Sequence, residues 1–181
     1  MERATVAIYD ERGLAWAATH SSAGRRADAE SFAAGVPPGA LRIDVGCGAG
    51  RYLPFLGSPT IALDASASML AACRRAVPHA LFVQGDAEQL PLTRGSIGGA
   101  WSWMTHLHVP RARLPLALWD LQRALVVGAP LGLQVLHGDY EGDRLPGDEV
   151  GGRFFAGWRT DDLVDVVVGA GFGIEDGSVE A

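Results

Sequence analysis

Residues 41–50 read Leu41-Arg42-Ile43-Asp44-Val45-Gly46-Cys47-Gly48-Ala49-Gly50, a mostly apolar stretch that runs directly into alternating glycines. The apolar half predicts a β-strand, and the glycines predict a sharp turn in which no Cβ keeps the backbone away from a ligand. A strand, a glycine turn and a helix in this order are typical of a cofactor-binding loop. Gly46, Gly48 and Gly50 are therefore candidate cofactor-binding residues, and we expect Cys47 to be a small buried residue within the same turn.

Acidic side chains at the ends of the expected strands indicate which ligand the turn holds. Asp44 stands just before the glycines, and Arg51 occupies the position at which the dinucleotide fingerprint has a further glycine. A carboxylate there repels a pyrophosphate and attracts an ammonium group. Asp64 and Asp86 close the next two expected strands, where one can accept hydrogen bonds from ribose hydroxyls and the other from an amine of a base. S-adenosylmethionine has these groups and no phosphate.

Apolar segments that fit strands alternate with helical segments along most of the chain. We expect strands at residues 41–45, 60–63, 81–84, 100–104, 132–136 and 172–175, and helices at residues 66–76, 114–125 and 160–170. Nearly all-apolar strands that alternate with helices are typical of a parallel sheet covered on both sides. The sequence therefore predicts an α/β fold with a doubly wound, mainly parallel sheet and helices on both faces.

Three segments together resemble the class I, seven-strand S-adenosylmethionine-dependent methyltransferases. They are Asp44-Val45-Gly46-Cys47-Gly48-Ala49-Gly50, Leu63-Asp64-Ala65-Ser66-Ala67-Ser68-Met69-Leu70 and Gly85-Asp86-Ala87-Glu88-Gln89-Leu90-Pro91. The resemblance runs from about residue 41 to residue 172 and includes residues 101–110, which are similar to the segment after the fourth strand of these enzymes. The family usually ends its sheet with an antiparallel strand, which we expect to be missing because this chain stops soon after the sixth expected strand.

The resemblance implies a cofactor and its contacts. The cofactor is S-adenosylmethionine, with the glycines beside its methionine part, Asp44 near its ammonium group, Asp64 at the ribose and Asp86 at the adenine N6. The cofactor-binding residues that it implies are Asp44, Gly46, Cys47, Gly48, Gly50, Asp64, Ala65, Met69, Asp86, Ala87, Ser102 and Trp103. We expect Trp101 and Trp103 to point to opposite faces of their strand, with one in the core and one beside the cofactor.

Histidines near the ends of the fourth and fifth expected strands are the candidate catalytic residues. His106 and His108 follow the fourth strand and His137 ends the fifth, on the edge at which an acceptor would enter. A free imidazole has a pKa of about 6.5 and can act as a base at neutral pH, while the same residues can instead serve in packing or hydrogen bonding. Tyr140 is a further candidate. The segment of residues 138–159 is long, polar and glycine-rich, so we expect it to form a functional or mobile loop, and the resemblance implies that this loop covers the acceptor.

The chain of 181 residues has the size of one domain. Within it we expect residues 1–36 to form a helical lid or cap, and residues 37–181 to form the S-adenosylmethionine-binding domain. The first region holds two helical patches joined by a polar turn at residues 21–24. Tyr9 and Trp16 in the first patch either cover the active site or fasten this helix to the sheet.

Composition excludes several kinds of chemistry and partner. The chain has no lysine, so lysine Schiff bases and a phosphate-loop lysine are excluded. Its net charge of −6 and its pI of about 5.3 argue against a nucleic-acid partner. Cys47 and Cys73 form no metal-ligand spacing, so we expect no metal site and a reducing, cytoplasmic location. The first residues show no signal-peptide pattern and no apolar stretch is long enough for a bilayer, so we expect no membrane association, and we expect a monomer or a homodimer.

The expected reaction is the in-line transfer of a methyl group from S-adenosylmethionine to a small-molecule acceptor, for which alignment is the enzyme's main task. One alternative is an RNA methyltransferase, because residues 48–54 are similar to those of enzymes that methylate a carboxymethyl group on the wobble uridine of transfer RNA. A second alternative is a non-catalytic module that binds the cofactor. A third, a nucleotide-dependent oxidoreductase, is disfavoured by Asp44 and Arg51.

Overall fold

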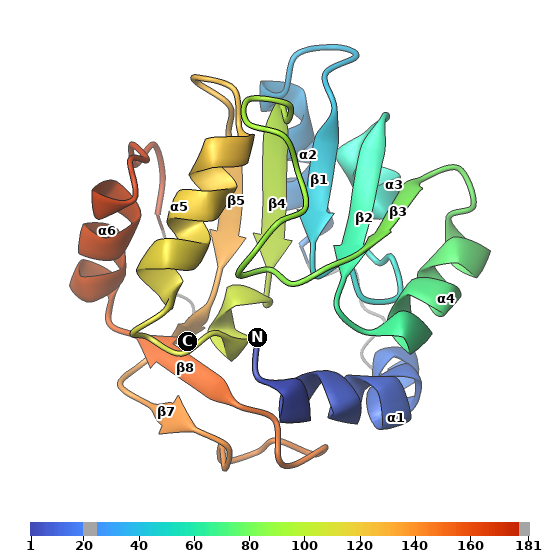
Figure 1. Cartoon of the computed structure of the whole chain (residues 1–181), viewed down its shortest axis with the longest axis vertical. Helices are drawn as coiled ribbons and strands as arrows, with labels where there is room; N and C mark the ends of the chain where they lie inside the picture. The colour runs from blue at the N-terminus through green and yellow to red at the C-terminus, as the bar shows by residue number, and fades with distance from the viewer. Residues whose placement is uncertain (20–24, 178–181) are drawn as a thin grey trace.

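The computed structural model describes residues 1–19 and 25–177, so the expected turn at residues 21–24 lies outside the described residues. Five strands form one sheet in the order β3-β2-β1-β4-β5, and every neighbouring pair is parallel. Their bounds are Arg42–Val45 for β1, Thr60–Asp64 for β2, Leu81–Gln84 for β3, Gly99–Trp103 for β4 and Leu131–Gln134 for β5. The carboxyl ends of these strands therefore meet at one edge of the sheet, at the bottom in Figure 1.

Helices cover both faces of this sheet. In chain order they are α1 (Arg3–Thr19), α2 (Arg26–Gly35), α3 (Leu53–Leu56), α4 (Ala67–Ala76), the 3-10 helix η1 (His106–His108), α5 (Leu114–Ala124) and α6 (Thr160–Gly169). Helices α2, α3 and α4 share one apolar cluster with the sheet, and α5 shares another, with α6 beside it. Helix α1 runs across the carboxyl edge of the sheet (Figure 1). The predicted α/β fold with helices on both faces is confirmed.

The core lies on both sides of β1. Ile43 and Val45 are fully buried in the cluster that includes α5, and Asp44 between them has its side chain on the opposite face because successive strand residues alternate. The glycines at the start of β4 let α2 approach closely, since a Cβ at Gly99 would lie 2.5 Å from Val36 Cγ2. The burial of β1 on both faces explains why its sequence is nearly continuous in apolar residues.

Residues 138–159, expected to form a loop, contain two strands. With β6 (Leu136–His137), the strands β7 (Glu141–Gly142) and β8 (Phe155–Trp158) form a second sheet in the order β6-β8-β7. Strand β8 pairs with β6 in parallel and with β7 in antiparallel orientation. The expectation was wrong because the polar residues of this segment mask the buried run of β8. The fifth expected strand also differs, since β5 ends at Gln134 and the chain passes to the second sheet at Leu136.

The strand expected at residues 172–175 is absent among the described residues. Phe172 instead follows α6 in a turn, where its amide donates to the Val167 carbonyl at 3.2 Å and its ring packs against the α5 side of the core. Two glycines flank this phenylalanine and leave too few apolar residues for a ladder. Within residues 1–19 and 25–177, β5 pairs with β4 and with no second strand of the same sheet.

The two N-terminal helices occupy different places. Helix α2 contributes Ala29 and Phe32 to the core on one face of the sheet, whereas α1 packs against α4 at the carboxyl edge. None of the helices in the described residues combines the length and the apolar character that crossing a membrane requires. The region in which the expected site residues meet is therefore bounded by the carboxyl edge of the first sheet, by α1 and by the second sheet.

Candidate cofactor and acceptor site

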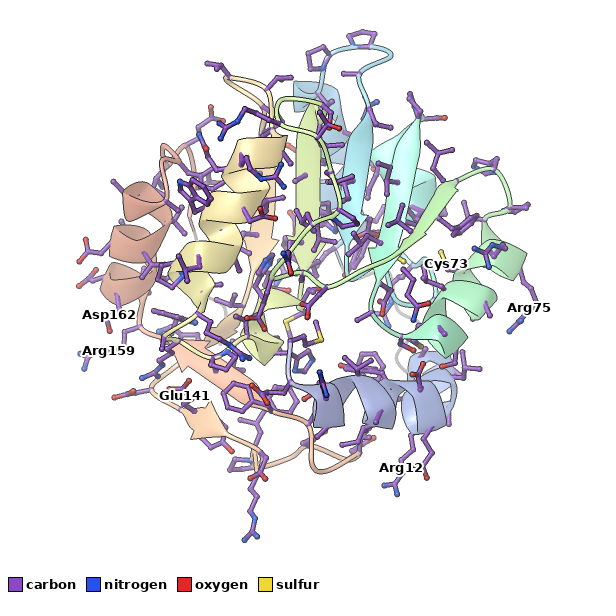
Figure 2. The ribbon with its side chains drawn as sticks, in the orientation of Figure 1. Arg12, Cys73, Arg75, Glu141, Arg159 and Asp162 are labelled. Carbon is purple, nitrogen blue, oxygen red and sulfur yellow. The ribbon has the colours of Figure 1, made fainter. Side chains whose placement is uncertain are left out.

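The glycine turn after β1 is fastened to β2. Two successive backbone amides of the turn, beginning with Gly46, donate to the Leu63 carbonyl at 2.7 and 2.9 Å. Gly46 has φ +73°, and a Cβ there would lie 2.1 Å from Thr105 Oγ1. Gly50 has φ +88°, and its Cβ would lie 2.9 Å from the sulfur of Cys73, which faces the sheet from α4 (Figure 2). Both positions therefore need glycine for their conformation and for space.

The carboxylate of Asp64 organises the turn from the end of β2. Its Oδ2 accepts from the Gly48 amide and its Oδ1 from the Ser66 amide, both at 2.8 Å. Burial raises the pKa of this carboxyl. The two amides act in the opposite direction, because hydrogen bonds to the charged form favour it, but the effect of burial is larger. Ala65 follows, and its carbonyl accepts from Gln84 Nε2 at 3.0 Å. A carboxylate oxygen can accept more than one hydrogen bond, so Asp64 can still take the hydroxyls of a ribose.

The side chain of Asp44 is buried beneath the glycine turn. Only 2% of the residue is exposed, and its Oδ2 has no hydrogen-bond partner. Burial raises the pKa of Asp44 well above its usual value, and the nearby Cys73 and Asp64 raise it further. A buried acceptor without a partner is costly, which makes this carboxyl a place for a ligand that brings a donor or a positive charge.

Helix α1 covers the start of α4. Ser66 caps α4 by accepting from the Met69 amide at 3.2 Å, and Asp10 of α1 accepts from the Ser66 hydroxyl at 2.7 Å and from the Ser68 amide at 3.1 Å. Gly13 lies against Met69, because a Cβ on this glycine would be 2.9 Å from the Met69 sulfur. Met69, expected to flank an adenine, is thus buried between α1 and the glycine turn.

Asp86 lies after β3 and already accepts from an amine. Both of its carboxylate oxygens are 2.9 Å from the amino nitrogen of Met1, and Oδ1 also accepts from the Glu88 amide at 2.9 Å. The Met1 amino group forms a second ion pair with the Glu88 carboxylate. Ala87 is buried beside the ring of His106. The chemistry expected of Asp86, acceptance from a nitrogen donor, is therefore present at this position.

The two tryptophans of β4 lie on the same face, so the expectation of opposite faces was wrong. Residues two apart in a strand point to the same side. The rings of Trp101 and Trp103 are stacked, with centroids 4.4 Å apart and an interplanar angle of 2°. Tyr52, after the glycine turn, meets the Trp101 ring edge-on at 5.6 Å. Trp101 is buried, and Trp103 is the partly exposed member at the end of the strand.

Ser102 points to the other face and holds His106. A hydrogen bond of 2.6 Å joins Ser102 Oγ to His106 Nδ1, and both residues are buried. Burial lowers the pKa of His106 to about 4, so its ring is neutral at neutral pH. This pair joins β4 to the turn that follows it, and the other ring nitrogen of His106, Nε2, is buried without a hydrogen-bond partner.

His108 connects the turn after β4 to α1 and to β8. Its Nδ1 lies 2.6 Å from the Phe154 carbonyl, so it carries the proton in the neutral ring, and its Nε2 accepts from the Tyr9 hydroxyl at 2.9 Å. Burial lowers the pKa of His108 to about 4. Burial also raises the pKa of Tyr9, which keeps the phenol protonated and able to donate. The His108 Nε2 atom can therefore take a proton from a ligand only by way of the Tyr9 hydroxyl, or directly after Tyr9 moves.

Arg153 completes this network and was not predicted from the sequence. It is 6% exposed, forms an ion pair with the buried Asp148 carboxylate, and donates from Nη1 to the Tyr9 hydroxyl at 2.9 Å. Its guanidinium lies over three aromatic rings, at 5.3 Å from Tyr9, 5.3 Å from Trp16 and 5.2 Å from Phe155. These contacts fix α1 to the segment before β8, beside the region bounded by the carboxyl edge of the first sheet, α1 and the second sheet.

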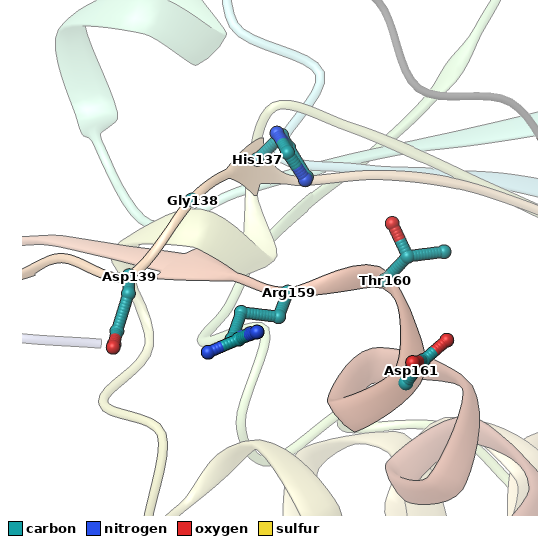
Figure 3. Close-up of a pocket in the computed structure, with 6 residues that line it drawn as sticks. All are labelled: His137, Gly138, Asp139, Arg159, Thr160 and Asp161. Carbon is teal, nitrogen blue, oxygen red and sulfur yellow. The ribbon is translucent and has the colours of Figure 1, made fainter.

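His137 lies apart from the other two histidines. It is exposed at the end of β6 and lines an open hollow of about 520 Å³ with Gly138, Asp139, Arg159, Thr160 and Asp161 (Figure 3). Tyr140 turns into its own segment, where its hydroxyl accepts from the Arg144 amide at 2.8 Å. In the part of the chain that the structure describes, no three His, Cys, Asp or Glu side chains gather as possible metal ligands.

The residues that the sequence did not predict come from contacts between distant segments. Asp10, Tyr9 and Arg153 meet their partners across 56 to 144 residues of sequence. Local motifs carry no signal for such contacts. The glycine at position 13 of an otherwise regular helix was the one visible sign that α1 packs closely against another element.

Comparisons with known proteins point to one family. Residues 43–128 match the family model described as a methyltransferase domain. An uncharacterized methyltransferase of Synechocystis is 31% identical over 105 residues, which are 56% of this chain and 50% of the relative. The chain thus spans about half the length of this curated relative.

Solved structures share the fold at low identity. The DhpI-SAH complex has a TM-score of 0.74 and 19% identity, over 93% of this chain and 86% of that one. The [4+2]-cyclase SpnF has a TM-score of 0.74 and 21% identity, over 94% of this chain and 72% of that one. Because one of these two neighbours is a cyclase, the fold alone does not fix the reaction.

Proposed function

Because the chain belongs to the class I S-adenosylmethionine-dependent methyltransferases, whose cofactor is S-adenosylmethionine, we propose that it transfers the methyl group of this cofactor to a small-molecule acceptor. When bound, the cofactor supplies a methyl group on a positively charged sulfur, and the acceptor takes it by in-line displacement. The protein's part is to hold both reactants in line and to exclude water.

The observation that carries this proposal is the buried, unpartnered oxygen of Asp44 beneath a turn that needs glycine. In our proposal the ammonium group of the cofactor supplies the missing partner of Asp44. Asp64 accepts from the ribose hydroxyls while it keeps the Gly48 amide in place. The adenine lies toward Met69, Ala87 and Asp86, where its N6 amine competes with the amino group of Met1 for the Asp86 carboxylate.

The acceptor in this proposal binds where α1, η1 and the second sheet meet. His108 is the candidate residue to hold a proton from the acceptor, by way of the Tyr9 hydroxyl that it already bonds. His106 positions this turn through Ser102, and His137 stands at an exposed hollow farther along the edge. Arg153 and Asp148 keep the wall of the acceptor region closed. Transfer to an acceptor that loses no proton would need none of these histidines as a base.

Calorimetry with S-adenosylhomocysteine and with NAD tests the cofactor half of the proposal. We expect S-adenosylhomocysteine to bind with a stoichiometry of one and NAD to give no binding heat. Asp44→Asn, which keeps the shape and removes the charge, should weaken this binding by at least about tenfold, since hydrogen bonds to charged groups contribute about 1.5–3 kcal/mol. Asp165→Asn, at an exposed position on α6, is the matched control. Binding of NAD instead of S-adenosylhomocysteine would overturn the proposal.

A screen for S-adenosylhomocysteine release tests the transfer itself. The purified chain and S-adenosylmethionine are incubated with a library of small alcohols, phenols, amines and carboxylic acids, and separately with bulk transfer RNA. Release that depends on a small molecule supports the proposal. Release that depends on transfer RNA alone would replace the small-molecule acceptor with an RNA acceptor.

A further inference from the structure

We propose that Cys47 and Cys73 are an oxidative modification site: they form an internal disulfide with peroxide as the oxidant, and this bond distorts the glycine turn so that the cofactor no longer fits. The first half of this inference is independent of the proposed function. The second half rests on it, because it concerns the affinity for the cofactor.

The two sulfur atoms are already in contact. Their distance is 4.0 Å, and the Cys47 thiol also lies 3.6 Å from the Gly48 carbonyl. They are the two cysteines of the whole sequence, and both are buried, with exposed fractions of 6% for Cys47 and 0% for Cys73. Cys47 is part of the cofactor-binding turn and Cys73 lies on the inner side of α4, whereas Arg75 of the same helix projects outward (Figure 2).

The turn can supply the movement that bond formation needs. A disulfide has an S–S length of about 2.05 Å, so the sulfurs must approach by roughly 2 Å. Cys47 stands between two glycines with positive φ, at positions 46 and 48, and glycine changes its backbone angles at low cost. Helix α4 is held by its Ser66 cap and by the core, so in our proposal bond formation draws the turn toward the helix, at the expense of the bonds that fasten the turn to Leu63 and Asp64.

The chemistry balances with peroxide as the only co-reactant. The Cys47 thiol donates to the Cys73 sulfur, which lowers the pKa of Cys73 and favours its reactive thiolate. Attack of one sulfur on peroxide breaks the O–O bond and gives a sulfenic acid and one water. The second sulfur then attacks the first, so that the S–S bond forms, the S–O bond breaks and a second water leaves. Two thiols are oxidised and one peroxide is reduced.

The consequence for the cofactor follows from the neighbours of Cys47. The amide of Gly48 donates to Asp64, which is the proposed ribose acceptor, and Gly50 packs directly against the Cys73 sulfur. A turn that is drawn toward α4 loses the Gly48–Asp64 bond and the space that the glycines keep open. Disulfide formation and cofactor binding therefore oppose each other, and by linkage the bound cofactor must also protect the thiols.

Thiol counting after oxidation tests the first half. The reduced full chain is treated with hydrogen peroxide, unfolded, alkylated and weighed by mass spectrometry. We expect no alkylated cysteine, a mass lower by two hydrogens apart from methionine oxidation, and a peptide pair linked through Cys47 and Cys73. Cys73→Ser is the matched control and cannot form the bond. Two alkylated thiols in oxidised wild type, or sulfonic acids in place of the linked peptides, would overturn the inference.

Calorimetry with S-adenosylhomocysteine tests the second half. We expect the oxidised wild type to bind at least about tenfold more weakly than the reduced chain, and dithiothreitol to restore the affinity. Cys73→Ser treated with the same peroxide should keep its affinity, which separates the disulfide from oxidation of Met69. Equal affinity of the oxidised and reduced chains would refute the coupling while the disulfide stands. If the reduced chain fails to bind S-adenosylhomocysteine, the proposed function fails and the thiol result is unaffected.

Discussion

At the level of single residues, Asp64 joins the glycine turn to the helix that follows β2. Replacing it in Asp64→Ala removes the acceptor for two backbone amides and for the proposed ribose hydroxyls. We expect at least about tenfold weaker binding of S-adenosylhomocysteine, because hydrogen bonds to charged groups contribute about 1.5–3 kcal/mol. Calorimetry measures the affinity, and Asp165→Ala on the exposed face of α6 serves as the control. An unchanged affinity would place the ribose elsewhere.

Gly46 allows a comparison in which backbone strain is held constant. Gly46 and Gly39 have nearly equal φ values, +73° and +75°, but a Cβ at position 46 meets Thr105 whereas nothing lies within 4 Å of a Cβ at position 39. We expect Gly46→Ala to lower the free energy of unfolding by about 1–3 kcal/mol more than Gly39→Ala does, as is usual for overpacking. Urea unfolding followed by circular dichroism gives both values. An equal decrease in unfolding free energy for Gly46→Ala and Gly39→Ala would mean that Thr105 moves away from the new methyl group without an energetic cost.

Single residues also mark how far sequence reasoning reaches. Asp44, Asp64 and Asp86 were predicted at strand ends because a parallel sheet brings those ends together. In the structure Asp64 ends β2, Asp44 is the last residue but one of β1, and Asp86 lies two residues after β3. Trp101 and Trp103 were wrongly expected on opposite faces of β4, although their spacing of two residues already places them on the same face. Arg153 could not be predicted, because its partners in α1 lie more than a hundred residues away and no local pattern records them.

At the level of elements, the Tyr9 hydroxyl joins α1 to the turn after β4 and to the segment before β8, in addition to the bonds that Asp10 makes with the start of α4. The Tyr9 hydroxyl donates to His108 and accepts from Arg153, both at 2.9 Å. Tyr9→Phe leaves both partners buried without this bond, so we expect the free energy of unfolding to fall by about 1–3 kcal/mol and amide exchange in α1 to quicken. Tyr140→Phe, whose hydroxyl takes an exposed amide, should cost less than about 1 kcal/mol. A larger loss of unfolding free energy in Tyr140→Phe than in Tyr9→Phe would contradict the role of the Tyr9 hydroxyl in holding α1.

The turn after β4 gives the stability a dependence on pH. Burial lowers the pKa of His108 to about 4. Between about pH 6.5 and 4 this histidine is therefore protonated in the unfolded chain and neutral in the folded chain, and acidification favours unfolding. His106, whose pKa is also lowered, likewise makes the folded state less stable on acidification. Asp44 and Asp64 have raised pKa values, so their protonation on acidification favours the folded state.

We therefore expect a difference between wild type and His108→Gln. The free energy of unfolding of wild type should fall on acidification through this window by up to about 1.4 kcal/mol per pH unit more steeply than that of the variant. Urea titrations at several pH values measure both slopes. Identical slopes would show that His108 is not held neutral.

Among the elements, those with strong local patterns were predicted and those formed by distant pairing were not. The first five strands and the three long helices after residue 40 were predicted within a few residues, because their apolar periods are strong. The strands β7 and β8 were missed because β7 has two residues and β8 is preceded by a polar, glycine-rich segment. Such short strands owe their existence to pairing across the chain rather than to their own sequence.

For the whole molecule, the net charge bears on the proposed choice of a small-molecule acceptor over RNA. The chain carries 15 basic and 21 acidic residues, a net charge of −6. We expect no binding of bulk transfer RNA at protein concentrations up to about 10 µM in about 150 mM salt, since affinity for phosphate backbones depends on positive charge. Fluorescence anisotropy of labelled RNA at rising salt measures this, with S-adenosylhomocysteine binding as the salt-tolerant comparison. Micromolar binding with a steep salt slope would favour the RNA acceptor.

The stacked indoles of β4 give the protein an optical handle. Trp103 is partly exposed at the end of β4, and its ring lies flat on Trp101, so a ligand that bound against Trp103 would change the surroundings of both chromophores at once. Emission excited at the red edge of tryptophan absorption then reports occupancy without a dye. Ligand libraries can be read in a plate fluorimeter, with Trp101→Phe and Trp103→Phe variants to separate this signal from that of the other three tryptophans.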